Sequence, residues 1–117
     1  MQELELPHGD FLKFAKKILE KQHGTARVLI EFPKTPSLGM FIEAAAQSCA
    51  ALNEHEEVQE AYLVALKSIK LHNPVTTKRY EVLLREEFTL EKMIYIKFEV
   101  TDKDTKIVDG YLTIAIQ

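Results

Sequence analysis

Apolar and polar side chains alternate most regularly in the C-terminal part of the chain. In residues 93–100, and again in residues 108–116, apolar residues or glycine recur at every second position. A period of two predicts β-strands with one buried face, and the charged segment 102–104 between them predicts a tight turn. Residues 62–71 and 80–88 are two further strand candidates upstream. These four segments predict a meander of antiparallel strands.

A period close to 3.6 residues replaces this alternation between residues 37 and 53. The apolar positions at helical spacing are Leu38, Phe41, Ile42, Ala45, Cys49 and Leu52. They predict one long helix, and Ser37 is suited to be its N-cap because a serine hydroxyl can accept a hydrogen bond from a free backbone N–H of the first turn. The other positions are mostly Ala, Ser and Met, so we expect this helix to be buried on nearly all sides.

Residues 11–32 fit two patterns. In the first, the apolar stripe of a helix consists of Phe11, Phe14, Ala15 and Ile18. In the second, residues 16–22 and 25–32 are two strands joined at His23-Gly24, where glycine supplies the positive φ of a tight turn. With either pattern, a buried helix covered by an antiparallel sheet predicts an α+β fold in a single domain over residues 1–117. Such a sheet leaves an open edge, so we expect a homo-oligomer, a dimer or a dimer of dimers.

The composition is that of an ordinary globular protein, with 117 residues of which 46% are hydrophobic and 28% charged. A net charge of −3 argues against nucleic-acid binding. The sequence shows neither a secretory signal nor an apolar membrane span, and we expect a cytoplasmic protein. Cys49 is the only cysteine and the four histidines lack ligand spacing, so we expect no metal and no cofactor.

Several short segments carry a family resemblance when they are taken in order. They are Leu6-Pro7-His8 with Phe11-Leu12, Ile18-Leu19-Glu20, Ala26-Arg27-Val28, Phe32-Pro33-Lys34-Thr35-Pro36, Gly39, residues 42–47 (Ile-Glu-Ala-Ala-Ala-Gln), Pro74-Val75 and residues 112–116. This order resembles the 3-hydroxyacyl-acyl-carrier-protein dehydratases and their thioesterase relatives in the hot-dog superfamily. The resemblance implies a hot-dog fold, in which a curved antiparallel sheet wraps a long central helix, and it favours the two-strand pattern for residues 11–32.

The residue before Phe32-Pro33 departs from the dehydratase pattern. Those enzymes have a catalytic histidine there, and this chain has Glu31. Dehydration in that family uses a histidine and a carboxylate on opposite sides of the substrate. The resemblance therefore favours hydrolysis of an acyl-CoA or acyl-carrier-protein thioester over dehydration. Glu31 is either a second carboxylate that replaces the histidine or a solvated strand end.

Glu43 is the first candidate for catalysis, because it is the only charged residue between Leu38 and Asn53. A carboxylate in an apolar helix is costly unless it is hydrogen-bonded or protonated, and this favours acid–base chemistry. Gln47 lies one turn later and can bond the carboxylate or the substrate. The backbone N–H groups near Gly39 and Met40 can hold the oxyanion of a thioester carbonyl.

The remaining site predictions concern the substrate. We expect Phe32 and Pro36 in the loop and Met40 on the helix to contact it. The helix flank formed by Met40, Ala44 and Ser48 predicts a slim tunnel for an acyl chain at the subunit interface.

Three functions remain open from the sequence. The chain is a thioesterase that uses Glu43, a dehydratase-like enzyme with a histidine from elsewhere, or a non-catalytic acyl-binding protein in which Glu43 only makes structural hydrogen bonds.

Overall fold

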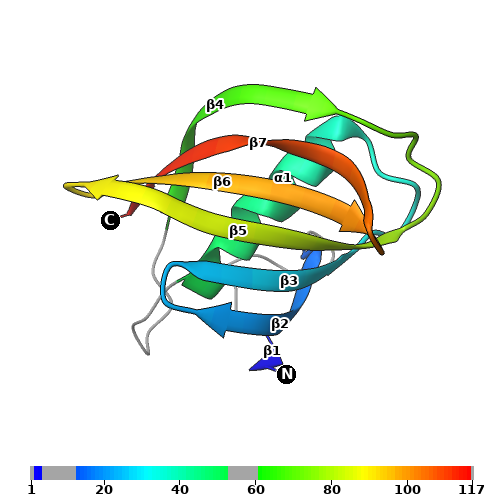
Figure 1. The fold of residues 1–117 in the computed structure, drawn as a ribbon, viewed down its shortest axis with the longest axis horizontal. Helices are drawn as coiled ribbons and strands as arrows, with labels where there is room; N and C mark the ends of the chain where they lie inside the picture. The colour runs from blue at the N-terminus through cyan, green and yellow to red at the C-terminus, as the bar shows by residue number, and fades with distance from the viewer. Residues whose placement is uncertain (1, 4–12, 53–60, 117) are drawn as a thin grey trace.

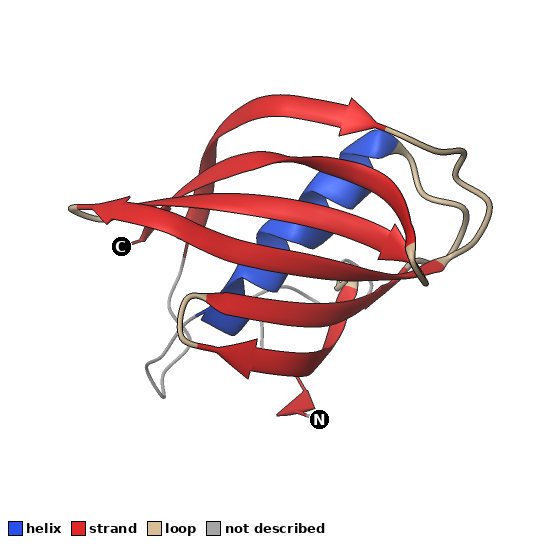
Figure 2. Ribbon diagram, viewed as in Figure 1, coloured by secondary structure: helices blue, strands red, loops and turns tan. Residues whose placement is uncertain are grey.

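The computed structural model describes residues 2–3, 13–52 and 61–116, which form one antiparallel sheet and one α-helix (Figure 1). The elements are β1 Gln2–Glu3, β2 Ala15–Gln22, β3 Thr25–Glu31, α1 Leu38–Ser48, β4 Ala61–Leu71, β5 Arg79–Leu90, β6 Met93–Asp102 and β7 Thr105–Ile116. The strand order across the sheet is β1-β2-β3-β5-β6-β7-β4. Figure 2 shows the strands curving across the helix, so that the helix lies along one face of the sheet.

The N-terminal ambiguity is resolved in favour of two strands. β2 and β3 pair antiparallel, with Gln22 opposite Thr25 and Ile18 opposite Val28. Gly24 in the connecting turn has a φ of 77°, a conformation that residues with a side chain rarely adopt. The helical stripe predicted as the alternative does not form in residues 13–32, while Phe11 lies outside the described residues.

The expected four-strand meander is only partly correct. β5, β6 and β7 are consecutive neighbours, but β4 pairs with β7 and β5 pairs with β3. The reason is the path of the chain, since α1 separates β3 from β4 along the sequence and runs across the sheet (Figure 1). The chain therefore leaves β3 near one side and β4 enters at the opposite edge.

Helix α1 begins as expected, at Ser37, whose hydroxyl accepts a hydrogen bond from the amide of Met40 at 3.2 Å. It is shorter than predicted, because a 3-10 turn, Cys49–Leu52, follows Ser48. The expectation of burial on nearly all sides is wrong for the single chain. The buried helical residues Phe41, Ala44, Ala45, Gln47 and Ser48 face the sheet, whereas Leu38 is 44% exposed and Glu43 is also exposed.

Four aromatic side chains join the helix to the N-terminal half of the sheet. Phe32 lies with its ring centroid 4.9 Å from that of Phe14 and 5.4 Å from that of Phe41. Tyr80 of β5 packs edge-on against Phe41 at 5.0 Å, and its hydroxyl donates to the carbonyl of Thr77. Offset and edge-on aromatic contacts of this kind stabilise a core beyond the area that they bury. They hold the loop before α1 against the sheet.

Candidate functional site

Glu43 and Gln47 lie one turn apart on α1 and are joined by a hydrogen bond. The Nε2 of Gln47 donates to Oε1 of Glu43 over 3.2 Å. Residues four apart on a helix are neighbours on its surface, as the sequence indicated. Glu43 itself is exposed in the single chain, contrary to the expectation that it is withdrawn from water. The physical reason is that its side of the helix faces away from the sheet.

Gln47 is buried and connects the helix to the start of β2. Its Oε1 accepts hydrogen bonds from the backbone amides of Phe14, at 2.8 Å, and Ala15, at 3.2 Å. Only the oxygen of a glutamine side chain can accept from an N–H group, so these two bonds fix which way the amide is turned. The Nε2 group is therefore directed at Glu43. Local sequence patterns could not indicate this anchor, because its partners lie 32 and 33 residues away along the chain.

The first turn of α1 presents backbone amides one turn before Glu43. Ser37 engages the amide of Met40 through its hydroxyl and the amide of Phe41 through its carbonyl. The amides of Leu38 and Gly39 precede these, at the positive end of the helix dipole. Gly39 is exposed, and a Cβ built on it would meet only the hydroxyl of Ser37, at 3.9 Å. A side chain at this position would therefore have room among the described residues.

The residues expected to contact substrate differ in how deeply they are buried. Met40 is half-buried on the helix, but Phe32 is 3% exposed in the aromatic cluster and Pro36 is also buried. Ala44 and Ser48 are fully buried within the chain, and the hydroxyl of Ser48 donates to the carbonyl of Ala44. The flank formed by Met40, Ala44 and Ser48 thus mostly faces the chain's own core. This corrects the expectation that it lines a tunnel between subunits.

The other candidates from the sequence are not brought to this site by any contact among the described residues. Glu31 is at an exposed strand end, 3.7 Å from the guanidinium of Arg79. Burial raises the pKa of the Cys49 thiol to about 12, so this cysteine is inert as a nucleophile at neutral pH. Of the histidines, His8 and His55 lie outside the described residues, and His23 is in the β2–β3 turn.

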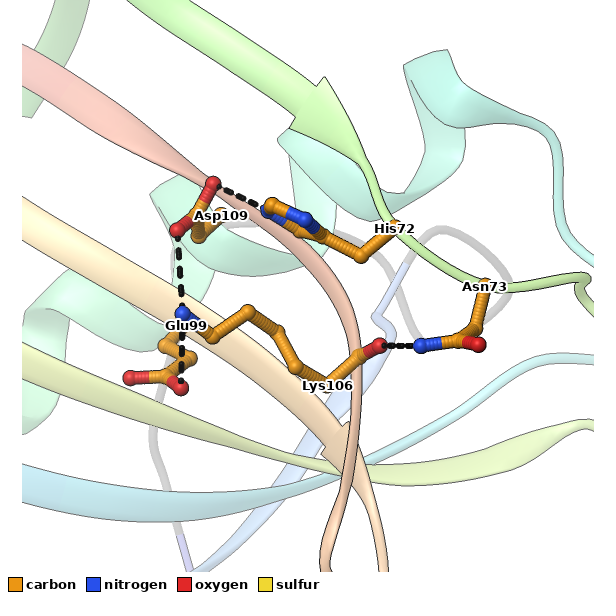
Figure 3. Close-up of polar contacts among 5 residues, drawn as sticks. All are labelled: His72, Asn73, Glu99, Lys106 and Asp109. Atoms are coloured by element: carbon orange, nitrogen blue, oxygen red, sulfur yellow. Dashed lines mark hydrogen bonds and ion pairs between the residues drawn. The ribbon is translucent and has the colours of Figure 1, made fainter.

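A polar network that the sequence did not reveal lies at the end of β4 (Figure 3). His72 and Asp109 are 2.8 Å apart, and Lys106 bridges Asp109, at 3.3 Å, and Glu99, at 3.4 Å. The hydrogen bond that Asp109 accepts from His72, followed by the one from Lys106, lowers the pKa of Asp109. Asp109 and Glu99 in turn raise the pKa of Lys106. Asn73 donates to the carbonyl of Lys106 at 2.7 Å. The network fastens the end of β4 to β7.

Within residues 2–3, 13–52 and 61–116, no three His, Cys, Asp or Glu side chains are grouped so that they could hold a metal ion. In the same part of the chain, no helix combines the length and the apolar character needed to cross a membrane.

No protein-family model matches the sequence, and comparison with curated protein sequences finds no relative. Solved structures do match over nearly the whole chain. A single helix along a curved antiparallel sheet, in the strand order described above, is the hot-dog fold, and this chain has it. The resemblance found in the sequence is confirmed at the level of the fold.

Among these structures, the dehydratase heterocomplex ApeI:P from Xenorhabdus doucetiae matches with a TM-score of 0.80 and 14% identity, over 96% of this chain and 88% of that one. The uncharacterized protein PH1136 from Pyrococcus horikoshii matches with a TM-score of 0.71 and 16% identity, over 100% and 95%. A hypothetical thioesterase protein with coenzyme A from Streptococcus pneumoniae TIGR4 has a TM-score of 0.68 and 9% identity, over 86% and 84%. Such low identities show a common fold, and a fold alone hosts many functions.

Proposed function

We propose that this protein hydrolyses acyl thioesters, carried by coenzyme A or by an acyl carrier protein, with Glu43 as the catalytic carboxylate. The observation that carries the proposal is the hydrogen bond by which buried Gln47 holds Glu43, which lies one turn after the exposed Gly39 in the first turn of α1. Thioester hydrolysis needs a base or nucleophile beside a donor for the oxyanion, and both are present on one side of α1. The solved structures with this fold include a dehydratase and a hypothetical thioesterase, which supports a thioester as the class of substrate.

The chemistry follows from these two groups. The amide of Gly39 donates to the thioester carbonyl oxygen and stabilises the negative charge that develops there. Glu43 either takes a proton from a water molecule as that water attacks the carbonyl carbon, or attacks the carbon itself and forms an anhydride that water then opens. In both routes the carbon–sulfur bond breaks, and the products are a carboxylic acid and a free thiol. Gln47 acts as a positioning residue for the carboxylate.

A second copy of the chain completes the site in this proposal. β4 pairs only with β7 among the described strands, so its other backbone edge is open. Its inward-facing leucines are 39% exposed at Leu63, 45% at Leu66 and 55% at Leu71, because α1 packs mainly on β2, β3, β5 and β7. An open edge beside exposed apolar side chains is a surface that proteins pair or cover. Pairing there would also bring a partner towards the exposed side of α1 and withdraw Glu43 from water.

The decisive test is a thiol-release assay with acyl-CoA substrates of increasing chain length. Wild type is compared with Glu43→Gln, which keeps the shape of the side chain but removes its charge. Asp104→Asn is the matched control, because Asp104 is an exposed carboxylate in the turn between β6 and β7. Glu31→Gln, measured in parallel, tests whether that residue replaces the histidine of the dehydratases.

We expect release by wild type and by Asp104→Asn, and a loss on the order of 100-fold or more in Glu43→Gln. Hydration of enoyl thioesters without thiol release would instead favour the dehydratase-like function. Binding of acyl chains without any turnover would leave a non-catalytic acyl-binding protein. The contribution of a second copy is tested by Leu66→Asp, which should lower both the molecular mass of the assembly and the activity while the fold is retained.

A cytoplasmic location stays a prediction from the sequence.

A further inference from the structure

Two loops lie side by side at one end of the molecule. Residues 32–37 connect β3 to α1, and residues 72–78 connect β4 to β5. The amide of Phe32 donates to the carbonyl of Lys78 at 2.8 Å, just beyond the last pair of the β3–β5 ladder. Figure 1 shows both loops at the end of the molecule where α1 begins, away from the β5–β6 turn. The two loops therefore form one surface beside the first turn of α1.

This surface is positively charged in a chain whose net charge is −3. Neither loop contains an aspartate or a glutamate, and each contains one lysine, Lys34 or Lys78. Both lysines are exposed, and neither ammonium group has a hydrogen bond or an ion pair to another described residue. The neighbouring cation Arg79 differs from them, because it lies 3.7 Å from the carboxylate of Glu31. Lys34 and Lys78 therefore retain uncompensated charges.

The two lysines are close enough to bind one anion. Residues directly opposite in a hydrogen-bonded antiparallel pair, as Phe32 and Lys78 are, have Cα atoms about 5.5 Å apart. Lys34 follows Phe32 by two residues, which is at most about 7 Å. The Cα atoms of the two lysines are thus at most about 12 Å apart. A lysine stem extends about 6 Å from its Cα atom, so both ammonium groups can reach the same phosphate.

Contacts with the core fix the backbone on both sides of this surface. Phe32 is buried in the aromatic cluster, and proline at positions 33 and 36 restricts the chain between Phe32 and the helix. In the second loop, the hydroxyl of Tyr80 accepts from the amide of Thr77 at 3.1 Å and donates to its carbonyl at 2.7 Å. Thr77 directly precedes Lys78. Both lysines therefore extend from ordered backbone, which lowers the entropic cost of binding a ligand.

The distance from this surface to the catalytic groups fits the pantetheine arm of a thioester substrate. Coenzyme A and acyl carrier proteins both present their acyl group on this arm, and a phosphate is attached at its other end. About fourteen bonds separate the thioester carbonyl from the phosphorus atom, so the extended arm spans about 17 Å. Gly39 follows Lys34 by five residues and lies within about 18 Å of it. A thioester bound at Gly39 and Glu43 can therefore place its phosphate between the two loops.

We infer that Lys34 and Lys78 bind the phosphate at the end of the pantetheine arm. The inference rests on the proposed function, because the arm has to deliver its thioester to α1. Lysine binds phosphate as a mobile point charge, and two lysines match the negative charge of a phosphodiester. They lie too far along the arm to touch the reacting atoms. Their contribution is to the affinity for the carrier, while turnover depends on Glu43 and the amides of the first turn.

The first test measures binding without turnover. Calorimetric titration compares the hexyl thioethers of 4′-phosphopantetheine and of pantetheine, which differ only in the phosphate and cannot be hydrolysed. Wild type should bind the phosphorylated compound at least about tenfold more tightly, and Lys34→Gln/Lys78→Gln should reduce this preference to about twofold or less. Lys92→Gln is the matched control, because Lys92 is an exposed lysine in the β5–β6 turn. Equal affinity of wild type for both compounds overturns the inference.

Thiol release by the same variants separates this inference from the proposed function. In Lys34→Gln/Lys78→Gln, KM for an acyl-CoA should rise about tenfold while kcat stays within about twofold. Added salt should raise KM in wild type and have little effect in the double variant, because it screens exposed charges. A lower kcat with an unchanged KM overturns the inference. If wild type releases no thiol at all, the proposed function fails, whereas the calorimetric comparison still decides whether the lysines bind phosphate.

The two possible carriers are distinguished by presenting the same acyl group on coenzyme A and on a phosphopantetheine-bearing carrier protein. The carrier whose KM rises more in Lys34→Gln/Lys78→Gln is the one that the two lysines bind. An unchanged KM with both carriers overturns the inference. Thermal unfolding is the control for the fold, since replacing two exposed lysines should leave Tm within about 2 °C of wild type.

Discussion

Replacement of Gly39 by alanine should change stability and activity in opposite directions. Gly39 is the second residue of α1, its φ is not positive, and an added Cβ has only one neighbour, the Ser37 hydroxyl at 3.9 Å. Glycine costs a helix conformational entropy, so the alanine variant should gain about 0.4–1 kcal/mol in free energy of unfolding. For a chain of this size, this corresponds to a rise in Tm of roughly 2–6 °C.

The same methyl group should obstruct catalysis. The Cα–Cβ bond in a helix is tilted towards the N-terminus, which is the side on which the free amides point. A thioester oxygen must come within about 3 Å of the Gly39 nitrogen to be stabilised there. Loss of one oxyanion donor typically costs on the order of 100-fold in kcat. We therefore expect a more stable protein with a kcat/KM reduced at least about tenfold.

The assay is thermal unfolding together with thiol release from an acyl-CoA substrate. Gly24→Ala serves as the control glycine, because Gly24 has a φ of 77° with nothing within 4 Å of an added Cβ. That variant should lose about 1 kcal/mol of stability through backbone strain and keep its activity. Full turnover in Gly39→Ala would refute the assignment of this amide to the oxyanion. A lower Tm would refute the view that the position is sterically open.

Three further predictions follow from single contacts. Gln47→Leu should lose about 2–5 kcal/mol in urea unfolding because the amides of Phe14 and Ala15 lose their acceptor, whereas Gln47→Glu should lose less stability but still reduce thiol release. Asp109 has a lowered pKa in the folded state, so its ionised form stabilises the fold, by at most about 1 kcal/mol, at neutral pH. This contribution should disappear as the pH falls below about 4. The test compares the free energy of unfolding of wild type and Asp109→Asn across this pH range. In Gly110→Ala, the new Cβ would lie 2.3 Å from Cδ1 of Ile69, so Tm should fall by the equivalent of about 1–3 kcal/mol and recover partly when Ile69→Val is added.

Local patterns predicted the elements better than their arrangement. Alternation identified the segments of β6 and β7, and helical spacing with Ser37 identified the start of α1, because these signals come from residues close in sequence. The position of β4 could not be obtained in this way. Its segment has a strand-like composition, but its pairing with β7 depends on the course of the chain after α1. Contacts of this kind join segments far apart in sequence and leave no periodic trace.

In the candidate site, too, local contacts could be predicted from the sequence and long-range contacts could not. The spacing of Glu43 and Gln47 on one helix predicted that Gln47 bonds either the carboxylate or the substrate, and the hydrogen bond to the carboxylate is present. The spacing did not predict that Gln47 is anchored by the amides of Phe14 and Ala15 at the start of β2, or that His72 and Asp109 are joined by a hydrogen bond. Each of these interactions depends on a partner that only the three-dimensional fold brings within reach.

The structure of a single chain does not fully explain the composition of α1. The helix has one charged residue, Glu43, yet in one chain Leu38 and Glu43 are both exposed. A helix that stood permanently at a water surface would be expected to carry polar residues on that side. The scarcity of polar residues is therefore explained if the exposed side of α1 is covered in the assembly. The polarity around Glu43, and with it the strength of its interactions with a substrate, is then a property of the oligomer, whereas its orientation by Gln47 is already set within each chain.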